Sequence, residues 1–179
     1  MDTYIRGLGE KVLDGAALTR DEALFVHNIS LKSDTIYDLL YWANKIRQRF
    51  LGSDISCCAL VSAKQGKCPE DCCFCAQSVR FDTTVEEFPL MEREGLGKAV
   101  GGASGSGAGS LGIVTSGREL SDSDLAKLCE RLRGVNGTNG VHIHASLGLL
   151  SPKGARELKG SGVRRINHNL ETSERFFPR

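Results

Sequence analysis

The chain has 179 residues, of which 23 are Lys or Arg and 22 are Asp or Glu, giving a formal net charge of +1. This length suits one ordinary domain with its own core, and the balanced charge argues against a nucleic-acid-binding surface. No apolar run approaches the ~20 residues that span a bilayer, and the start of the chain lacks the apolar segment of a secretory signal. We therefore expect a cytoplasmic protein with no nucleic-acid or membrane partner.

The first 52 residues are expected to form a helical segment. Thr19 and Glu22 make a capping box ahead of a short helix. Over residues 35–50, apolar side chains recur at steps of three and four, which predicts an amphipathic helix that Gly52 ends.

From residue 53 onward, short apolar runs alternate with amphipathic stretches. The runs predict buried strands and the stretches predict helices. In chain order, the expected elements are a strand at 55–63, a helix at 85–100, a strand at 111–115, a helix at 121–133, a strand at 141–147, a helix at 152–159, a strand at 163–166 and a helix beginning at 172–177. This alternation predicts parallel βαβ units over 53–179, within a single α/β domain overall.

Two features of this region are expected to have structural rather than functional roles. The glycine run 101–109 follows a predicted helix and precedes a strand, whereas a phosphate-binding loop follows a strand and precedes a helix, so we expect a flexible connection. Cys129 lies on the apolar face of its predicted helix and is expected to be a small buried hydrophobe.

The strongest chemical signal is the loop after the first predicted strand. The chain has seven cysteines, an odd number that argues against a disulfide framework in a reducing compartment. Cys68, Cys72 and Cys75 have the spacing Cx3Cx2C. Three thiolates can hold three irons of a cubane cluster and leave the fourth iron open, whereas electron carriers use four cysteines. Phe74 offers an apolar surface beside such a cluster, and Cys73 breaks the spacing. A structural zinc site and ordinary free thiols are the alternatives.

This loop resembles that of the radical S-adenosylmethionine (SAM) enzymes. The sequence around the loop, together with three later segments, resembles the biotin synthase family. The similar segments are residues 63–78 (AKQGKCPEDCCFCAQS), 115–118 (TSGR), 145–148 (ASLG) and 165–173 (RINHNLETS), so that the resemblance covers about residues 20–179.

The resemblance implies an enzyme with a [4Fe–4S] cluster on Cys68, Cys72 and Cys75, with SAM bound to the open iron. It implies that one electron, from a donor such as flavodoxin or ferredoxin, cleaves SAM to a 5′-deoxyadenosyl radical. That radical takes hydrogen from dethiobiotin, and sulfur insertion then completes biotin. The cofactors carry the difficult chemistry, and the protein positions them.

The resemblance also implies roles for the polar residues after the fourth predicted strand. Asn169 and Glu171, with Phe74, would contact SAM, and Asn167 and Asn169 would contact dethiobiotin. Glu171 stands where the family commonly has Asp. From the residues alone, the same string is better explained as a capping cluster for the helix expected from residue 172.

The sequence departs from the family at its auxiliary, sulfur-donating cluster. Gly112 and His144 stand at two positions where the family has cysteine ligands. Glycine offers no ligand, and known histidine ligation of a two-iron cluster uses histidines in pairs, so the auxiliary cluster is doubtful. An alternative hypothesis is that Cys57 or Cys58 supplies a thiolate to a different auxiliary cluster. One of these two adjacent residues should face the interior of the barrel, because strand side chains alternate.

Length is the second departure. A complete (β/α)8 barrel takes ~250 residues, so this chain has room for about four βα units after its N-terminal helices. We expect a partial TIM-type barrel, either a fragment or a chain that associates, for example as a homodimer. The favoured function is that of a biotin synthase-type radical SAM sulfurtransferase. The alternatives are a related radical SAM enzyme without the sulfur donor and a non-catalytic metal-binding remnant.

Overall fold

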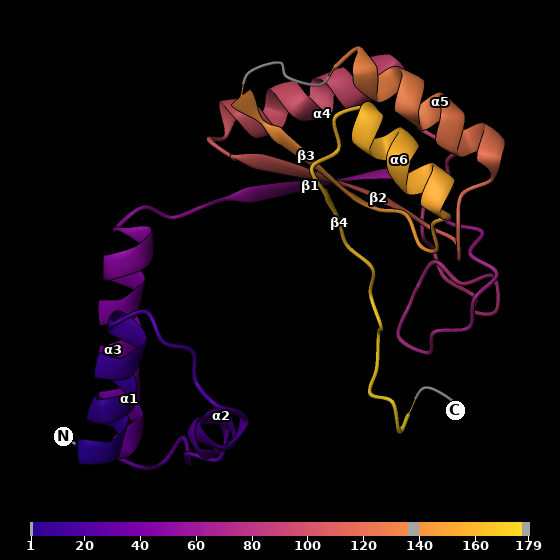
Figure 1. Ribbon diagram of the computed structural model, residues 1–179. Helices are drawn as coiled ribbons and strands as arrows, with labels where there is room; N and C mark the ends of the chain where they lie inside the picture. Colours follow the sequence, from indigo (N-terminus) through magenta and orange to yellow (C-terminus); the bar gives the residue numbers. More distant parts are fainter. Residues whose placement is uncertain (1, 136–139, 177–179) are drawn as a thin grey trace. The chain divides into compact units, whose positions relative to one another are not determined.

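The computed structural model describes residues 2–135 and 140–176 (Figure 1). The chain forms two compact units, Met1–Ile55 and Ser56–Arg179. Among the described residues, none of the helices combines the length and the apolar character needed to cross a membrane.

The first unit consists of three helices, α1 (Thr3–Leu13), α2 (Arg20–His27) and α3 (Thr35–Leu51). The capping box predicted at Thr19 is confirmed, since its hydroxyl accepts from the Glu22 N–H while the Glu22 carboxylate accepts from the Thr19 N–H. Helix α1 was not predicted from the sequence. Its contact with α3 depends on Gly9, because a Cβ there would lie 2.6 Å from Cγ of the buried Trp42.

The second unit is built on a four-stranded parallel sheet, which confirms the predicted α/β partial barrel. The strands are β1 (Cys58–Lys64), β2 (Ser110–Thr115), β3 (His142–Ser146) and β4 (Arg165–Ile166). They lie in the order β1-β2-β3-β4, so that each strand pairs with the next in the chain, as successive βαβ units require. The helices α4 (Arg93–Gly105), α5 (Asp122–Arg133) and α6 (Pro152–Gly160) cover one face of this sheet (Figure 1).

The core lies between that face and the three helices. Alternate strand residues point into it, as a sheet with one covered face requires. Its fully buried side chains include Leu96, Leu111, Ile113, Leu128, Leu132, Ile143 and Leu158. Cys129 belongs to the same core, as predicted, and burial raises the pKa of its thiol.

Three predicted segments are wrong in detail. The helix expected at 85–100 begins only at Arg93, and it continues through the first half of the glycine run, to Gly105. The run is therefore partly helical rather than a flexible connection, because Val100 and Ala103 are buried and hold that turn against the core. Residues 172–176 form turns rather than the start of a helix, and Phe177 lies outside the described residues.

Candidate metal centre

The cysteine loop follows β1 and is closed at its base by backbone hydrogen bonds. The Cys68 N–H donates to the Gln77 carbonyl at 3.0 Å, and the Val79 N–H donates to the Cys68 carbonyl at 3.0 Å. Ser78, only 4% exposed, donates its hydroxyl across the loop to the Glu70 carbonyl. Because buried polar groups that find partners hold their surroundings in one arrangement, these bonds hold the span between Cys68 and Ser78 as a defined loop.

The three predicted ligands share one environment within this loop. Cys68, Cys72 and Cys75 are half-buried, whereas Cys73 is exposed. A tight turn joins two of them, since the Cys75 N–H donates to the Cys72 carbonyl at 2.9 Å. Burial raises the pKa of the Cys72 thiol, and the charges of Glu171, Cys75 and Cys68 raise it further. The three thiols are therefore close enough to influence one another electrostatically.

Three thiols on one closed loop are candidate ligands of a cubane cluster. Within the described residues, no three Cys, His, Asp or Glu side chains surround one ion-sized point. A [4Fe–4S] cluster places no such demand, because each thiolate binds a different iron and the ligands stand round a larger body. Three free thiols on one closed loop are compatible with that arrangement.

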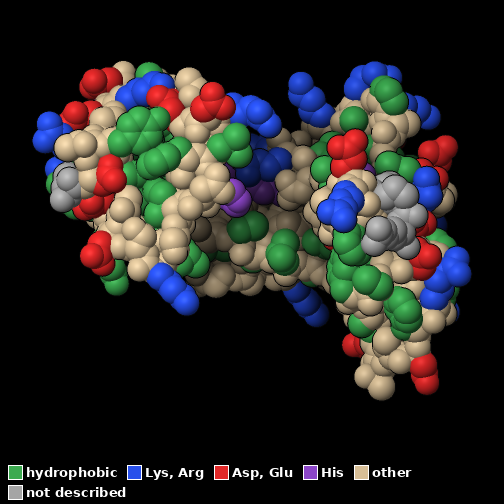
Figure 2. Space-filling model, turned by 90° about the horizontal axis from the view of Figure 1, so that it is seen from below, with side chains coloured by type: hydrophobic (Ala, Val, Ile, Leu, Met, Phe, Trp, Pro, Cys, Tyr) green, Lys and Arg blue, Asp and Glu red, His purple; other side chains and the backbone are tan. Residues whose placement is uncertain are grey.

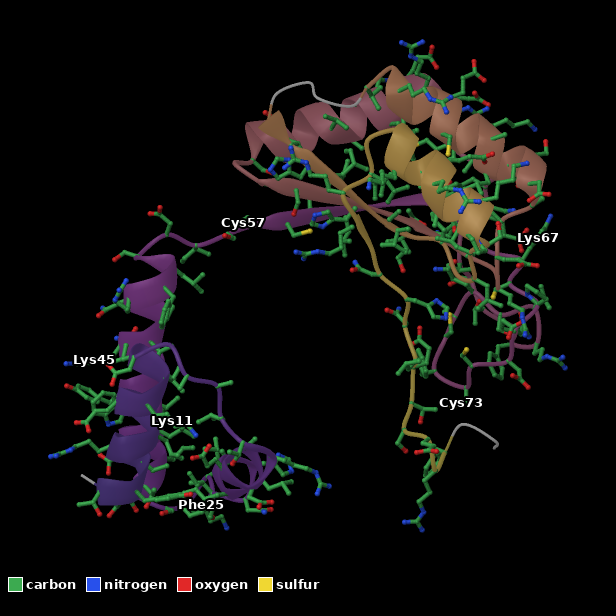
Figure 3. All side chains as sticks on the ribbon, in the orientation of Figure 1. Lys11, Phe25, Lys45, Cys57, Lys67 and Cys73 are labelled. Carbon is green, nitrogen blue, oxygen red and sulfur yellow. The ribbon has the colours of Figure 1, made fainter. Side chains whose placement is uncertain are left out.

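The segment after β4 brings the other predicted residues toward the loop. The Asn167 N–H donates to the Ala145 carbonyl at 2.8 Å and so extends the sheet ladder by one residue. Beyond it, Asn169 and Glu171 are exposed. Glu171 has φ 63°, a left-handed conformation in a non-glycine residue, and its carboxylate lies near enough to Cys72 to influence that thiol. Figure 3 shows this segment beside the loop that carries Cys73.

Phe74 occupies the tip of the loop, where it is 66% exposed. An exposed ring beside the thiols is a suitable stacking surface for a planar ligand. Its position thus agrees with a cofactor contact, whereas a core role is excluded by its exposure.

Contacts that the sequence did not reveal tie the loops at this end of the sheet together. The Ser116 hydroxyl donates to the Gly66 carbonyl at 2.7 Å, joining the loop after β2 to the cysteine loop. Arg118 extends toward Glu70, with 3.9 Å between the guanidinium nitrogen and the carboxylate oxygen. The Leu149 N–H donates to the Arg118 carbonyl at 2.8 Å, joining the loops after β2 and β3. Carboxyl ends of parallel strands are where barrel enzymes carry their sites.

The two positions that depart from the family lie in one row across the sheet. Leu60, Gly112, His144 and Arg165 are paired partners on β1, β2, β3 and β4. The Leu60 side chain fills the space above Gly112, since a Cβ on Gly112 would lie 2.5 Å from Leu60 Cδ2. This row therefore does not fit a two-iron cluster, because one ligand position holds only a leucine methyl group and the next holds a lone histidine.

Cys57 and Cys58 are both exposed. Cys58 heads the adjacent row, paired through Ser110 with His142. Within the described residues these groups form no metal-binding cluster, so an auxiliary site there stays a hypothesis.

Comparison with known proteins matches residues 63–179 to the radical SAM superfamily. Biotin synthase of Trichlorobacter lovleyi is 38% identical over 178 residues, covering 99% of this chain and 53% of that protein. Biotin synthase of Akkermansia muciniphila is 38% identical over 168 residues, covering 94% and 51%. The expected similarity to biotin synthases is thus confirmed, and the chain spans about half the length of the curated relatives it matches.

Solved structures support the same fold. HydG, a maturase of the [FeFe]-hydrogenase, superposes with a TM-score of 0.73 at 15% identity, covering 92% of this chain and 36% of HydG. HydG from Carboxydothermus hydrogenoformans gives a TM-score of 0.71 at 19% identity, covering 90% and 37%. The closed cysteine loop, the parallel sheet and these matches agree: the chain belongs to the radical SAM superfamily, whose members use a [4Fe–4S] cluster and SAM.

Proposed function

We propose that this chain carries out the biotin synthase type of radical SAM chemistry on dethiobiotin. One observation supports the proposal: the Glu171 carboxylate, in the segment after β4, lies close enough to the cysteine loop after β1 for its charge to raise the pKa of the Cys72 thiol. The biotin synthases at 38% identity support the choice of substrate.

Each residue has a distinct part in this proposal. Cys68, Cys72 and Cys75 hold the [4Fe–4S] cluster, which when bound supplies the electron that cleaves SAM. Phe74 packs against SAM, the Asn169 amide donates to or accepts from its ribose hydroxyls, and the Glu171 carboxylate accepts from them. Asn167 and Asn169 hold the ureido ring of dethiobiotin, so that the hydrogen to be removed faces the SAM-derived carbon. The protein thereby supplies orientation and the exclusion of side reactions, and the cofactors supply the radical.

The setting of this chemistry belongs to the same proposal. Residues 53–179 make up the radical SAM partial barrel, and residues 1–52 form the helical segment ahead of it. The cluster receives its electron from a flavodoxin or a ferredoxin, and a reducing compartment, the cytoplasm, keeps the seven thiols available.

A second candidate function is hydrogen abstraction without sulfur insertion. The observation that favours it is the Leu60 side chain above Gly112, at a position where the family resemblance leads us to expect a ligand of the sulfur donor. Under this candidate, SAM cleavage and substrate binding are unchanged, and the reaction yields a product other than biotin.

Anaerobic reconstitution with iron and sulfide, followed by incubation with SAM, a reductant and deuterated dethiobiotin, tests both candidates. We expect a broad brown absorption from the cluster and deuterium transfer into 5′-deoxyadenosine. Biotin among the products supports the first candidate, and labelled 5′-deoxyadenosine without biotin supports the second. Failure to bind a cluster contradicts both, and Cys72→Ser serves as the matched negative control.

A further inference from the structure

The face of the sheet opposite the helices carries histidine and arginine side chains. We call it the open face, defined by the outward residues of its two most basic rows. One row consists of Leu60, Gly112, His144 and Arg165, and the other of Cys58, Ser110 and His142. Seen from below, His and Lys or Arg side chains stand together over the strands (Figure 2). No Asp or Glu belongs to either row, so the positive charge is not balanced within the face.

Arg164 and Arg165 concentrate this charge at β4. The Arg164 guanidinium lies 3.0 Å from His142 Nε2, and the hydrogen bond draws that side chain toward the open face. Throughout residues 2–135 and 140–176, neither arginine pairs with a carboxylate. A separate groove between α6 and the edge strand β4 is lined by Lys159 and both arginines. A guanidinium without a carboxylate partner is a strong binding group for an oxyanion, because its planar fork can donate two hydrogen bonds at once.

His144 completes the binding surface as a neutral hydrogen-bond donor. Burial, followed by the charges of Arg165 and His142, lowers its pKa. A neutral imidazole carries one N–H and so donates to an anion without adding a full charge. Leu60 lies above Gly112 on the other side of His144, and it gives the row an apolar end.

We propose that Arg165 and His144 bind an oxyanion of the substrate, a carboxylate or a phosphate, on the open face. This inference rests on the proposed function for the location of the reacting carbon. Because alternate strand residues share a face, Asn167 lies on the same side as Arg165, about 7 Å further along the chain. A substrate with a polar ring at Asn167 and an acidic end at Arg165 spans that distance with its aliphatic chain along β4. The row thus selects an aliphatic acid, in place of holding a second cluster.

The test follows binding directly, by NMR of the full chain labelled at His and Arg side chains, after reconstitution and with SAM present. The probes are dethiobiotin, its methyl ester and inorganic phosphate. We expect saturable shifts of His144 and of the Arg165 Nε–H with dethiobiotin, and at least tenfold weaker binding of the ester, because a charge-assisted pair is lost. Arg165→Gln should remove the difference between acid and ester. Arg165→Lys should keep part of it, since charge remains without the planar fork.

Arg156→Gln is the matched control, because Arg156 is a residue of the neighbouring helix α6 and is no part of the groove. It should bind all probes like the wild type. The inference is overturned if neither dethiobiotin nor phosphate shifts these resonances, or if acid and ester bind equally. Shifts with phosphate alone support the oxyanion site and contradict dethiobiotin as the substrate. SAM cleavage, measured in parallel, separates loss of this site from loss of the proposed radical chemistry.

Discussion

Gly148 is the point where the loops after β2 and β3 touch, and its replacement by alanine is the sharpest test of how the site is assembled. Gly148 has φ 75°, and an added Cβ would overlap the Arg118 carbonyl oxygen and lie 2.7 Å from the carbonyl carbon. Backbone atoms cannot rotate away as a side chain does. The overlap therefore also breaks the hydrogen bond from the Leu149 N–H to that carbonyl.

The expected destabilisation follows from three costs and one gain. An alanine in the left-handed backbone conformation is disfavoured by ~1–2 kcal/mol. The forced movement of packed backbone costs ~1–3 kcal/mol. The lost hydrogen bond costs ~0.5–1.5 kcal/mol. The smaller entropy of the unfolded alanine chain returns ~0.4–1 kcal/mol. Gly148→Ala should therefore lower the free energy of unfolding of the second unit by about 4 kcal/mol.

Urea denaturation followed by far-UV circular dichroism measures this change. Gly101→Ala is the matched control, because Gly101 lies in α4 with open space around it and an ordinary helical φ. It should raise the free energy of unfolding by about 0.5–1 kcal/mol, since glycine is unfavourable within a helix. If Gly148→Ala left stability within about 1 kcal/mol of the wild type, the loops after β2 and β3 would not be joined as described.

Three further predictions test the cluster ligands, the core and the open face. Cys72→Ser should abolish the iron content and visible absorption of the reconstituted chain, while Cys73→Ser, at an exposed position outside the spacing, should retain both. Leu128→Ala should lower the free energy of unfolding by about 2–5 kcal/mol in the same urea assay, because Leu128 is 0% exposed. Arg165→Gln should raise the pKa of His144, measured by NMR titration, because a neighbouring positive charge is removed. Since the lowered pKa means that the native state resists protonation, the wild type should lose stability as pH falls below about 6.5, and the variant should lose less.

The sheet and its order were predictable because each strand is marked locally. Leu111 and Ile113 on β2, and Ile143 and Ala145 on β3, are spaced by the two residues of a strand buried on one face, and turn residues separate these runs. The helix α1 was not predicted, because Gly7 and Gly9 interrupt its few apolar residues. Gly9 is required by a tertiary contact, because the Trp42 ring packs closely against it. Trp42 lies far along the chain, so the sequence around Gly9 does not indicate this contact.

The boundaries of α4 illustrate the same limit. Glycine disfavours a helix by ~1 kcal/mol per residue, so the run from Gly101 was expected to leave the helix. Burial of Val100 and Ala103 against the sheet offsets this cost over the next turn. Tertiary contact thus overrides a local preference, and only the assembled sheet reveals it.

The candidate site also has features that the local sequence predicts and features that depend on tertiary contacts. The Cx3Cx2C spacing is local, so the spacing alone identifies Cys68, Cys72 and Cys75 as candidate ligands. The ties that hold their loop, such as Ser116 to the Gly66 carbonyl, join residues 50 positions apart. No spacing rule predicts such a pair, because its cause is the meeting of strand ends in space.

Glu171 links the local and the long-range parts of the site. A glutamate with φ 63° is disfavoured by ~1–2 kcal/mol relative to an ordinary conformation, and its charge raises the pKa of the Cys72 thiol, opposing the thiolate that a cluster needs. For the apo chain, the residue is therefore doubly unfavourable, through its backbone and through its charge. Strain of this kind persists where the surrounding structure imposes it, most often at ligand sites. A ribose hydroxyl as partner would satisfy the carboxylate, and a bound cluster would spread the thiolate charge over iron. The proposed ligands would relieve the charge penalty alone, whereas the backbone penalty is borne by the fold of this segment with or without them.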